Sequence, residues 1–193
     1  MRRKLGILIS GRGSNMAALV EAARAPDCPY EVALVASDKP EAEGLAWAAE
    51  QGVATFAQSP RGMAKAEYEA RIDAALREAG VEAIALAGYM RLLSDDFVAR
   101  WRGRILNVHP SLLPKYKGLD THARAIEAGD SHGGVSVHIV TEELDGGEVL
   151  GQAEVAILPG DTAESLAERV LKEEHRLYPR IVAEFLCPKN LQG

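Results

Sequence analysis

The sequence predicts an α/β protein: a doubly wound, mostly parallel sheet with helices on both faces and a C-terminal antiparallel hairpin. In the first hundred residues, short continuous apolar runs alternate with longer amphipathic segments. Continuous apolar runs are typical of strands that are buried on both faces of a parallel sheet. After residue 130, two segments alternate apolar and polar residues around a glycine-rich turn, which indicates a hairpin.

The first half of the chain supplies the parallel part of this sheet. Three apolar runs are expected as strands: KLGILIS (residues 4–10), EVALVAS (31–37) and AIALAG (83–88). The segments between and after them have the amphipathic pattern of helices, which are expected to begin at Asn15, Glu43 and Ala64. Strands that alternate with helices in this way predict βαβ units.

The second half combines one more strand with a long loop and the hairpin. A helix over residues 95–101 leads to the strand RILNVH (104–109), and a loop with two prolines and a glycine separates it from a short helix at 121–128. The hairpin strands are GVSVHIV (134–140) and EVLGQAEVAI (148–157). A last helix has a capping-box pattern at Asp161 and Glu164, and Pro179 predicts a kink or an end to its first part. No internal repeat or linker divides the chain, so a single domain over 1–193 is expected.

Composition excludes several classes of protein. The 193 residues carry 22 Lys and Arg against 28 Asp and Glu, a net charge of −6, with 47% hydrophobic residues. An acidic chain disfavours nucleic acid as a partner, because binding its backbone relies on many basic contacts. No segment has the length of a signal-peptide core or a membrane span, so a cytoplasmic protein is expected. Cys28 and Cys187 stand apart with no metal-site spacing, so we expect neither a disulfide nor a metal.

The segment ISGRGSN after the first strand is a candidate anion site. Its glycines let the backbone turn tightly, while Ser14 and Asn15 can present polar groups at a helix N-terminus. It lacks the third glycine of a dinucleotide fingerprint and the GK[ST] of a P-loop. A glycine turn with an N-cap is also an ordinary way to pass from a strand to a helix. The segment alone leaves both interpretations open.

Asn107 and His109 form a second candidate site, in N-V-H-P-S-L-L-P. Two residues apart on a strand, their side chains point to the same face at the carboxyl edge of the sheet, where α/β proteins bind ligands. An amide donor beside an imidazole can polarise a carbonyl and move a proton. The alternative is a structural histidine at a strand end that is capped by an asparagine.

Asp145, in E-L-D-G-G, is a third candidate. An aspartate followed by two glycines is usually a turn residue, because its side chain bonds its own backbone. Against His109, the same carboxylate would hold one ring tautomer and favour the imidazolium. Sequence spacing does not decide between these two interpretations.

Taken together, the motifs resemble the phosphoribosylglycinamide formyltransferase family. GRGSNM, LAGYMRLLS, LNVHPSLLPKYKGLDTHARAIEAGD, GVSVHIVTEELDGGEVLGQAEV and EEHRLYP occur in the family's order, and the resemblance covers about residues 4–185. It implies the formyltransferase fold. The related methionyl-tRNA formyltransferases carry a further C-terminal domain and usually an R-G-A-A-P segment, whereas the loop here reads K-G-L-D-T-H. Formyltetrahydrofolate deformylases usually carry an N-terminal regulatory domain, whereas the first strand here begins near residue 5.

The resemblance implies transfer of the formyl group of 10-formyltetrahydrofolate to the amine of N1-(5-phospho-D-ribosyl)glycinamide, in de novo purine (IMP) biosynthesis. Asn107 and His109 would stabilise the oxyanion, and His109 would donate a proton to the departing folate nitrogen. Asp145 would orient the His109 ring and raise its pKa. Hydrolysis of 10-formyltetrahydrofolate is the alternative activity. The partners implied are these small molecules, without metal, nucleic acid or membrane, and the protein is expected as a monomer or homodimer.

The resemblance also assigns binding residues. About 1–100 forms a phosphoribosyl-binding half and about 101–193 a catalytic and folate-binding half. The ribonucleotide residues are Gly13, Ser14, Asn15, Met16 and Glu174. The residues assigned to the formyl folate are Lys65, Met90, Arg91, Leu92, Leu93, Asn107, Val140, Thr141, Glu142, Glu143 and Leu144.

Three positions depart from the family pattern. Arg12 stands between the glycines where asparagine is common, and Asp120 stands where many relatives have histidine. Lys65 replaces a usual arginine, and an ammonium group cannot make the same planar bidentate contact. An altered folate affinity is therefore expected.

Overall fold

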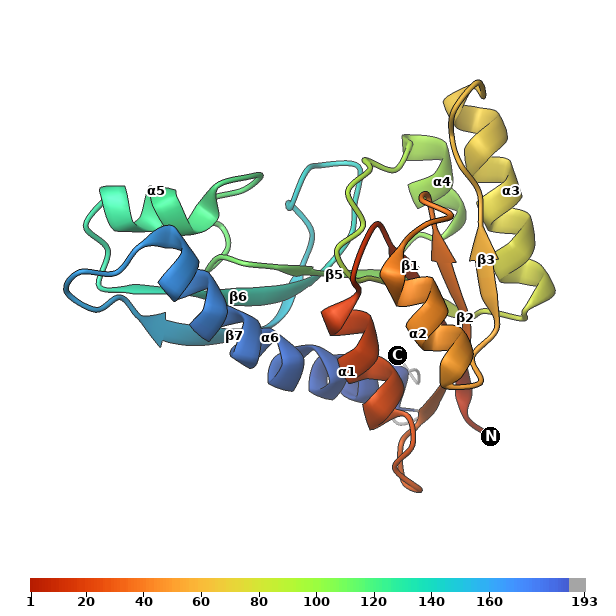
Figure 1. The fold of residues 1–193 in the computed structure, drawn as a ribbon, viewed down its shortest axis with the longest axis horizontal. Helices are drawn as coiled ribbons and strands as arrows, with labels where there is room; N and C mark the ends of the chain where they lie inside the picture. Colours follow the sequence, from red (N-terminus) through yellow and green to blue (C-terminus); the bar gives the residue numbers. More distant parts are fainter. Residues whose placement is uncertain (188–193) are drawn as a thin grey trace.

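A seven-stranded sheet runs through the computed structural model, which describes residues 1–187 (Figure 1). The strand order is β3-β2-β1-β4-β5-β6-β7. The first five strands pair in parallel and the last two antiparallel, which confirms the predicted sheet. The strands are β1 (Arg3–Ile9), β2 (Tyr30–Ser37), β3 (Thr55–Ala57), β4 (Ala83–Leu86), β5 (Ile105–His109), β6 (His132–Ile139) and β7 (Val149–Ala156).

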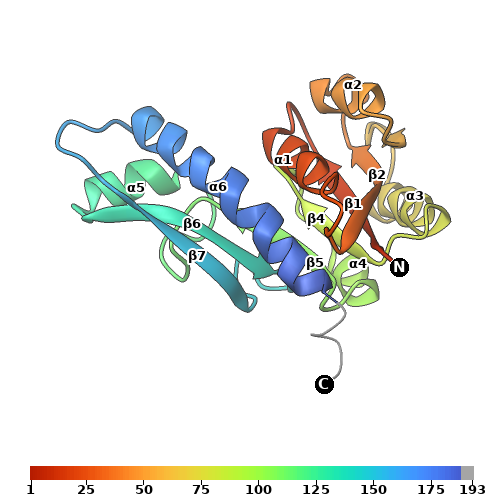
Figure 2. The ribbon, with the colours of Figure 1, turned by 90° about the horizontal axis from the view of Figure 1, so that it is seen from below.

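Helices cover both faces of the sheet, as Figure 2 shows. The helices are α1 (Ser14–Ala22), α2 (Glu43–Glu50), α3 (Lys65–Glu78), α4 (Asp95–Arg100), α5 (Thr121–Glu127) and α6 (Ala163–Leu186). Alternate residues of β1 point to opposite faces. Ile7 belongs to a core cluster with residues of α1, α2 and α6, whereas Leu8 belongs to a second cluster with residues of α3 and α4. The apolar strands of the first half are therefore buried on both sides.

The order of the strands reverses at β1, which lies between β2 and β4. In open α/β sheets, ligands bind beyond the carboxyl ends of the strands at such a switch point. The loops after β1 and β4 are joined here, because the Ser10 N–H donates to the Gly88 carbonyl at 3.2 Å and the Met90 N–H donates to Ser10 Oγ at 2.8 Å. The reversal therefore places the glycine-rich loop after β1 next to the loop after β4, which carries Met90.

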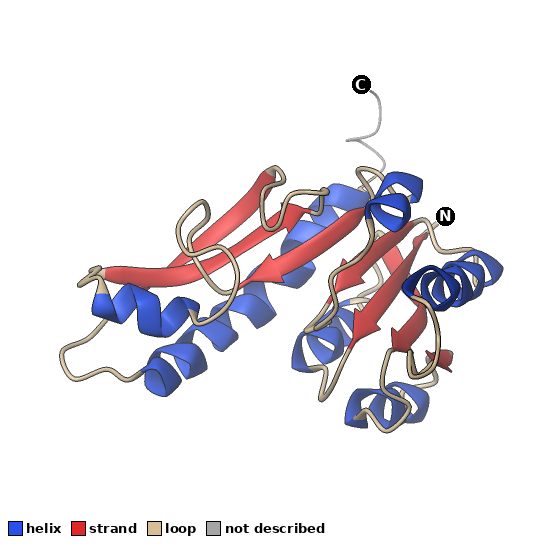
Figure 3. Cartoon of the chain, turned by 90° about the horizontal axis from the view of Figure 1, so that it is seen from above, coloured by secondary structure: helices blue, strands red, loops and turns tan. Residues whose placement is uncertain are grey.

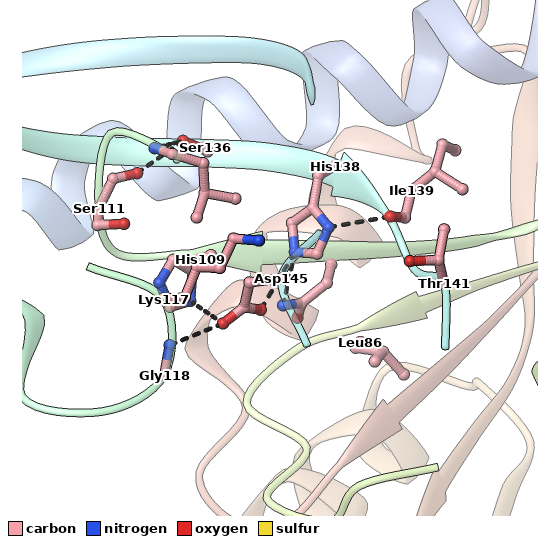
Figure 4. Close-up of polar contacts among 12 residues, drawn as sticks. Leu86, His109, Ser111, Lys117, Gly118, Ser136, His138, Ile139, Thr141 and Asp145 are labelled. Atoms are coloured by element: carbon pink, nitrogen blue, oxygen red, sulfur yellow. Dashed lines mark hydrogen bonds and ion pairs between the residues drawn. The ribbon is translucent and has the colours of Figure 1, made fainter. Parts of the chain in front are cut away.

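The hairpin of β6 and β7 extends the sheet beyond β5, with α6 along one face (Figure 3). Asn107 and His138 are direct partners in the antiparallel pairing of β5 and β6. The connection between β6 and β7, residues 140–148, is a long loop rather than a tight turn. It carries Asp145 back over the end of β5, as Figure 4 shows.

The C-terminal helix differs from the prediction in its capping box, and of the two outcomes predicted for Pro179, a kink or an end, the end does not occur. Its capping box is formed by Thr162 and Ser165, not by Asp161 and Glu164, because the Asp161 carboxylate pairs with Arg169. The helix also continues through Pro179 to Leu186. A proline removes only its own N–H from the helix. Buried residues on both sides, including Tyr178, whose hydroxyl donates to two sheet carbonyls, fix this turn against the sheet.

Strand β3 has no counterpart in the sequence prediction. Its three residues, Thr55 to Ala57, alternate between exposed and half-buried and have no continuous apolar run. They become a strand because β2 offers a free edge, with Val35, Ala36 and Ser37 as partners. Pairing with a neighbour, and not local preference, forms this element.

Trp101 anchors α3 and α4 to each other. Its ring is 1% exposed, and its indole N–H donates to Asp73 Oδ1 at 2.7 Å. The same carboxylate also accepts from Arg77 at 2.9 Å, and the guanidinium groups of Arg77 and Arg104 lie over the indole ring. Among the described residues, no helix is long and apolar enough to cross a membrane.

Candidate active site

Two cavities open at the carboxyl edge of the sheet. The larger, of about 760 Å³, lies between the loop after β4 and the loop from 140 to 148. The other, of about 590 Å³, lies between α1, the loop after β5 and α6. The residues that line both cavities are Tyr89, Met90, Asn107, His109, Gly118 and Leu119. The predicted pair Asn107 and His109 is therefore placed where the cavities meet.

His109 is held through both ring nitrogens. Its Nε2 lies 2.9 Å from the backbone carbonyl of Tyr116. Its Nδ1 lies 3.5 Å from Asp145 Oδ2 (Figure 4). The side chain is 7% exposed, so these two oxygens are its main polar surroundings. Both are acceptors, and only the imidazolium can donate to both at once.

Asp145 meets His109 as predicted. The residue has a positive φ of 48°, which turns its carboxylate toward the strand, and the Gly118 N–H donates to Oδ2 at 2.9 Å. Burial opposes ionisation of this carboxyl, but hydrogen bonds from His138 and Gly118 and the nearby imidazole of His109 outweigh it and lower the pKa of Asp145. The carboxylate is therefore kept charged beside His109.

His138 is a site residue that the sequence prediction missed. Its Nε2 lies 3.2 Å from Asn107 Nδ2 and 3.5 Å from Asp145 Oδ1, and its Nδ1 lies 3.0 Å from the Ile139 carbonyl. It therefore links the predicted amide to the predicted carboxylate. The available signal was the pairing register, since the residue opposite Asn107 on a neighbouring strand lies on the same face.

Asn15 and Glu174 line the second cavity and contact each other. Asn15 Nδ2 donates to Glu174 Oε2 at 2.6 Å, and both residues are 9% exposed. Burial raises the pKa of the Glu174 carboxyl, and the bond from Asn15 offsets this only in part. Among the described residues, Asn15 Oδ1 is buried without a hydrogen-bond partner, which leaves an acceptor for a ligand hydroxyl.

The glycine loop brings the first turn of α1 to the same edge. Gly13 has a φ of 71°, a conformation that favours glycine, and the first N–H groups of α1 have no partner within the helix. Ser14 lies at the first helical position, Met16 is buried in the core so that only its backbone can face a ligand, and Arg12 is exposed. The close approach of α2 at Gly44 fixes the loop, through a 3.2 Å bond from its N–H to the Gly11 carbonyl.

The first cavity is lined by every residue that the resemblance assigns to the folate. They are Lys65, Met90, Arg91, Leu92, Leu93, Asn107, Val140, Thr141, Glu142, Glu143 and Leu144. Met90 and Leu92 are 69% and 71% exposed. Apolar side chains that are exposed together on a cavity wall are typical of a surface that a ligand covers. The Arg91 guanidinium lies over the Tyr68 ring, with its carbon 5.2 Å from the centroid. Asp120, the third departure from the family pattern, lines the second cavity.

Within residues 1–187, no three His, Cys, Asp or Glu side chains are grouped as metal ligands, and Cys28 and Cys187 are free thiols. The polar groups that converge on the cavities are amides, imidazoles and carboxylates. Such a set can polarise a carbonyl, stabilise an oxyanion and transfer a proton.

Comparison with known proteins agrees with this arrangement. The formyl transferase family model matches residues 3–182, so the chain belongs to the formyl transferase family. Within it, the chain belongs with the phosphoribosylglycinamide formyltransferases. It is 42% identical to that enzyme of Escherichia coli over 180 residues, which cover 93% of this chain and 85% of the relative.

Two further comparisons extend the likeness to structure and to longer proteins. The crystal structure of phosphoribosylglycinamide formyltransferase from Brucella melitensis superposes with a TM-score of 0.93 at 52% identity, covering 97% of each chain. The chain is also 45% identical to the trifunctional purine biosynthetic protein adenosine-3 of Drosophila melanogaster. It covers 14% of the length of that protein, and 94% of this chain is matched.

Proposed function

We propose that the protein transfers the formyl group of 10-formyltetrahydrofolate to the amine of N1-(5-phospho-D-ribosyl)glycinamide, a step of de novo purine biosynthesis. The observation that carries the proposal is the junction of two cavities at Asn107 and His109. A transfer reaction without a free intermediate needs two substrates to meet at one set of catalytic groups. The name of the relatives, phosphoribosylglycinamide formyltransferase, specifies the acceptor and the group that is transferred.

The reaction begins when the amine nitrogen of the ribonucleotide attacks the formyl carbon. A carbon–nitrogen bond forms, and the carbonyl electron pair moves to the oxygen. The Asn107 amide donates to this oxyanion, and the positive charge of the His109 imidazolium, paired with Asp145, stabilises it electrostatically. The bond to folate N10 then breaks, the amine loses one proton, and N10 gains one through His109. The products are the N-formyl ribonucleotide and tetrahydrofolate.

The second cavity is proposed for the ribonucleotide. The first-turn N–H groups of α1, at Gly13 to Met16, bind its phosphate, because a helix N-terminus favours an anion. Glu174 accepts from ribose hydroxyls, and the free Oδ1 of Asn15 provides another acceptor. Arg12, exposed on the same loop, adds a positive charge near the phosphate.

The first cavity is proposed for the folate. Met90 and Leu92 cover its ring system, and Lys65 provides a positive charge for its acidic end. In this assignment about 1–100 is the phosphoribosyl-binding half and about 101–193 the catalytic and folate-binding half. Each half also contributes to the other cavity, since 90–93 line the first and Glu174 the second. A cytoplasmic location and a monomer or homodimer complete the proposal.

The test is the absorbance-monitored consumption of 10-formyltetrahydrofolate with and without the ribonucleotide, with formate measured in parallel. Consumption only in the presence of the ribonucleotide, with little formate, is the expected result. Equal consumption without the ribonucleotide, with stoichiometric formate, would make the protein a hydrolase and would overturn the assignment of the second cavity.

A further inference from the structure

The loop between β5 and α5 contacts His109 through its backbone. The Tyr116 carbonyl accepts from Nε2 at 2.9 Å, which places the Nε2 proton in this hydrogen bond. The other ring nitrogen, Nδ1, lies 3.5 Å from Asp145 Oδ2, and His109 lines both cavities. The orientation of the ring therefore depends on the Tyr116 carbonyl as well as on Asp145.

The Tyr116 carbonyl is held in place from the side of the loop that faces away from the cavities. Asp130 lies in the short connection between α5 and β6, and its carboxylate accepts from the Tyr116 hydroxyl at 2.7 Å. It also accepts from Lys115 Nζ at 3.0 and 3.1 Å. Two consecutive loop residues are thus attached to one carboxylate. Asp130 lines neither of the two cavities, so it touches no substrate in the proposed reaction.

Further contacts show that the loop is attached at several points. Arg124 of α5 donates to the Lys117 carbonyl at 2.8 Å and to the Leu119 carbonyl at 3.1 Å, and its guanidinium lies over the Tyr116 ring. Ser111 Oγ donates to the Lys115 carbonyl at 2.6 Å. Asp130 is the acceptor of the Tyr116 hydroxyl, and Tyr116 has a positive φ of 54°. Such a backbone conformation persists only where surrounding contacts hold it.

We propose that Asp130 is a positioning residue for formyl transfer, acting through Tyr116 and its carbonyl to hold the His109 ring against Asp145 at the junction of the two cavities. The proposal rests on the proposed function for its kinetic consequence, but its structural consequence for His109 does not. Displacement of the carbonyl removes one of the two polar contacts that hold the imidazole, so the ring can tilt and exchange tautomers. The main effect is expected on kcat, because Asp130 itself lines neither cavity.

The first experiment compares kcat and KM of the whole protein for three variants. Asp130→Ala is expected to lower kcat about 10- to 30-fold, with both KM values within about 2-fold, since small misplacements of catalytic groups cost up to about 10² in rate. Tyr116→Phe, which removes only the hydroxyl, is expected to lower kcat about 3-fold. Asp130→Asn keeps an acceptor for that hydroxyl and is expected to recover part of the loss. Glu127→Ala, an exposed carboxylate of α5, is the matched control and leaves kcat unchanged.

A double-mutant cycle separates positioning from a general loss of structure. In a His109→Asn background, Asp130→Ala is expected to cause no further loss of kcat, because the ring that it positions is gone. An equal loss in both backgrounds would overturn the proposal, as would a rise in KM with kcat unchanged.

The second experiment does not depend on the activity. Long-range ¹H–¹⁵N NMR of the histidine side chains reports which ring nitrogen of His109 carries the proton, with His109→Asn used to assign the signal. A neutral ring with its proton on Nε2 is expected at high pH in the unaltered protein, and a mixture of tautomers in Asp130→Ala. A proton on Nδ1 in the unaltered protein, or the same Nε2 form in Asp130→Ala, would overturn the proposal even if formyl transfer is confirmed.

Discussion

Asp145 and Glu174 are two buried carboxyl groups that line different cavities on either side of the shared residue His109. Their pKa values shift in opposite directions. Asp145 has the Gly118 N–H and two imidazoles around it, and its pKa is lowered. Glu174 has burial as the largest influence and one neutral amide as donor, and its pKa is raised.

The difference shows that donors of sufficient number and charge outweigh burial in setting the state of a carboxyl group, as at Asp145, and that burial prevails where they are fewer, as at Glu174. It also matches two different tasks in the proposed reaction. A carboxylate that must keep an imidazole charged has to remain ionised itself. A carboxyl group that binds hydroxyls works through hydrogen bonds and needs no strong cationic partner.

Removal of the groups where the cavities meet is expected to have the largest effect. Asn107→Ala and His109→Ala should each lower kcat by at least about 10²–10³, because one oxyanion donor is worth that much in other enzymes. Steady-state rates with both substrates saturating measure the loss, and circular dichroism controls for folding. A loss below about 10-fold for either variant would contradict the catalytic assignment and leave the two cavities without a shared chemical centre.

Exchange of each carboxyl group for its amide sharpens the comparison. Asp145→Asn is expected to lower kcat about 10²-fold with little change in KM, since the charge beside His109 is lost while the shape is kept. Glu174→Gln is expected to raise KM for the ribonucleotide roughly 5- to 10-fold with kcat nearly constant, because a weakened hydrogen bond costs about 1 kcal/mol. Initial rates measured over a range of concentrations of both substrates give kcat and the KM values of each variant. The same parameter changing in both variants would show that the carboxyl groups share one task.

The smallest effects are expected in the pH dependence of stability. The lowered pKa of Asp145 stabilises the fold above the unfolded value of about 3.9, and this contribution is lost as the pH falls through the folded value. The raised pKa of Glu174 has the opposite sign. The buried Glu174 carboxyl does not lower the free energy of unfolding below about pH 4, where it is protonated in both states. It lowers this free energy as the pH rises from there through the pKa of the folded state.

Urea unfolding at pH 4 and pH 7 measures these contributions. At pH 7, Asp145→Asn should lower the free energy of unfolding and Glu174→Gln should raise it, each by about 1 kcal/mol, a common size for a single substitution. The Glu174→Gln difference should shrink at pH 4, whereas the Asp145→Asn difference should largely remain, because pH 4 still lies above the lowered folded pKa of Asp145. Changes of the same sign at pH 7 would show that burial alone governs the two groups.

Sequence patterns predicted the apolar strands and the residues with distinctive chemistry, because both depend on local composition. Asn107, His109 and Asp145 come together as expected, and their motifs marked them before any coordinates. His138 could not be recognised in this way, because its place depends on the register of two antiparallel strands. The Tyr116 carbonyl carries no sequence signal at all, since every residue has such a group.

The same distinction explains the errors in secondary structure. The capping box shifted by one residue because Asp161 is paired with Arg169, eight residues further along the chain. Pro179 lies within a helix whose buried face outweighs one missing N–H. In both places a contact with another part of the chain overrides the local preference of the residue. Such contacts cannot be identified from a single sequence.

The placement of the two tryptophans has an optical consequence. Trp47 and Trp101 are the only ones in the sequence, and Trp101 lies buried against Asp73 between α3 and α4. Tryptophan fluorescence therefore reports on the part of the chain before residue 102, because the loop beside His109 carries no tryptophan of its own. Leu119, 73% exposed on that loop and facing both cavities, is where a new indole would make movements of the loop visible.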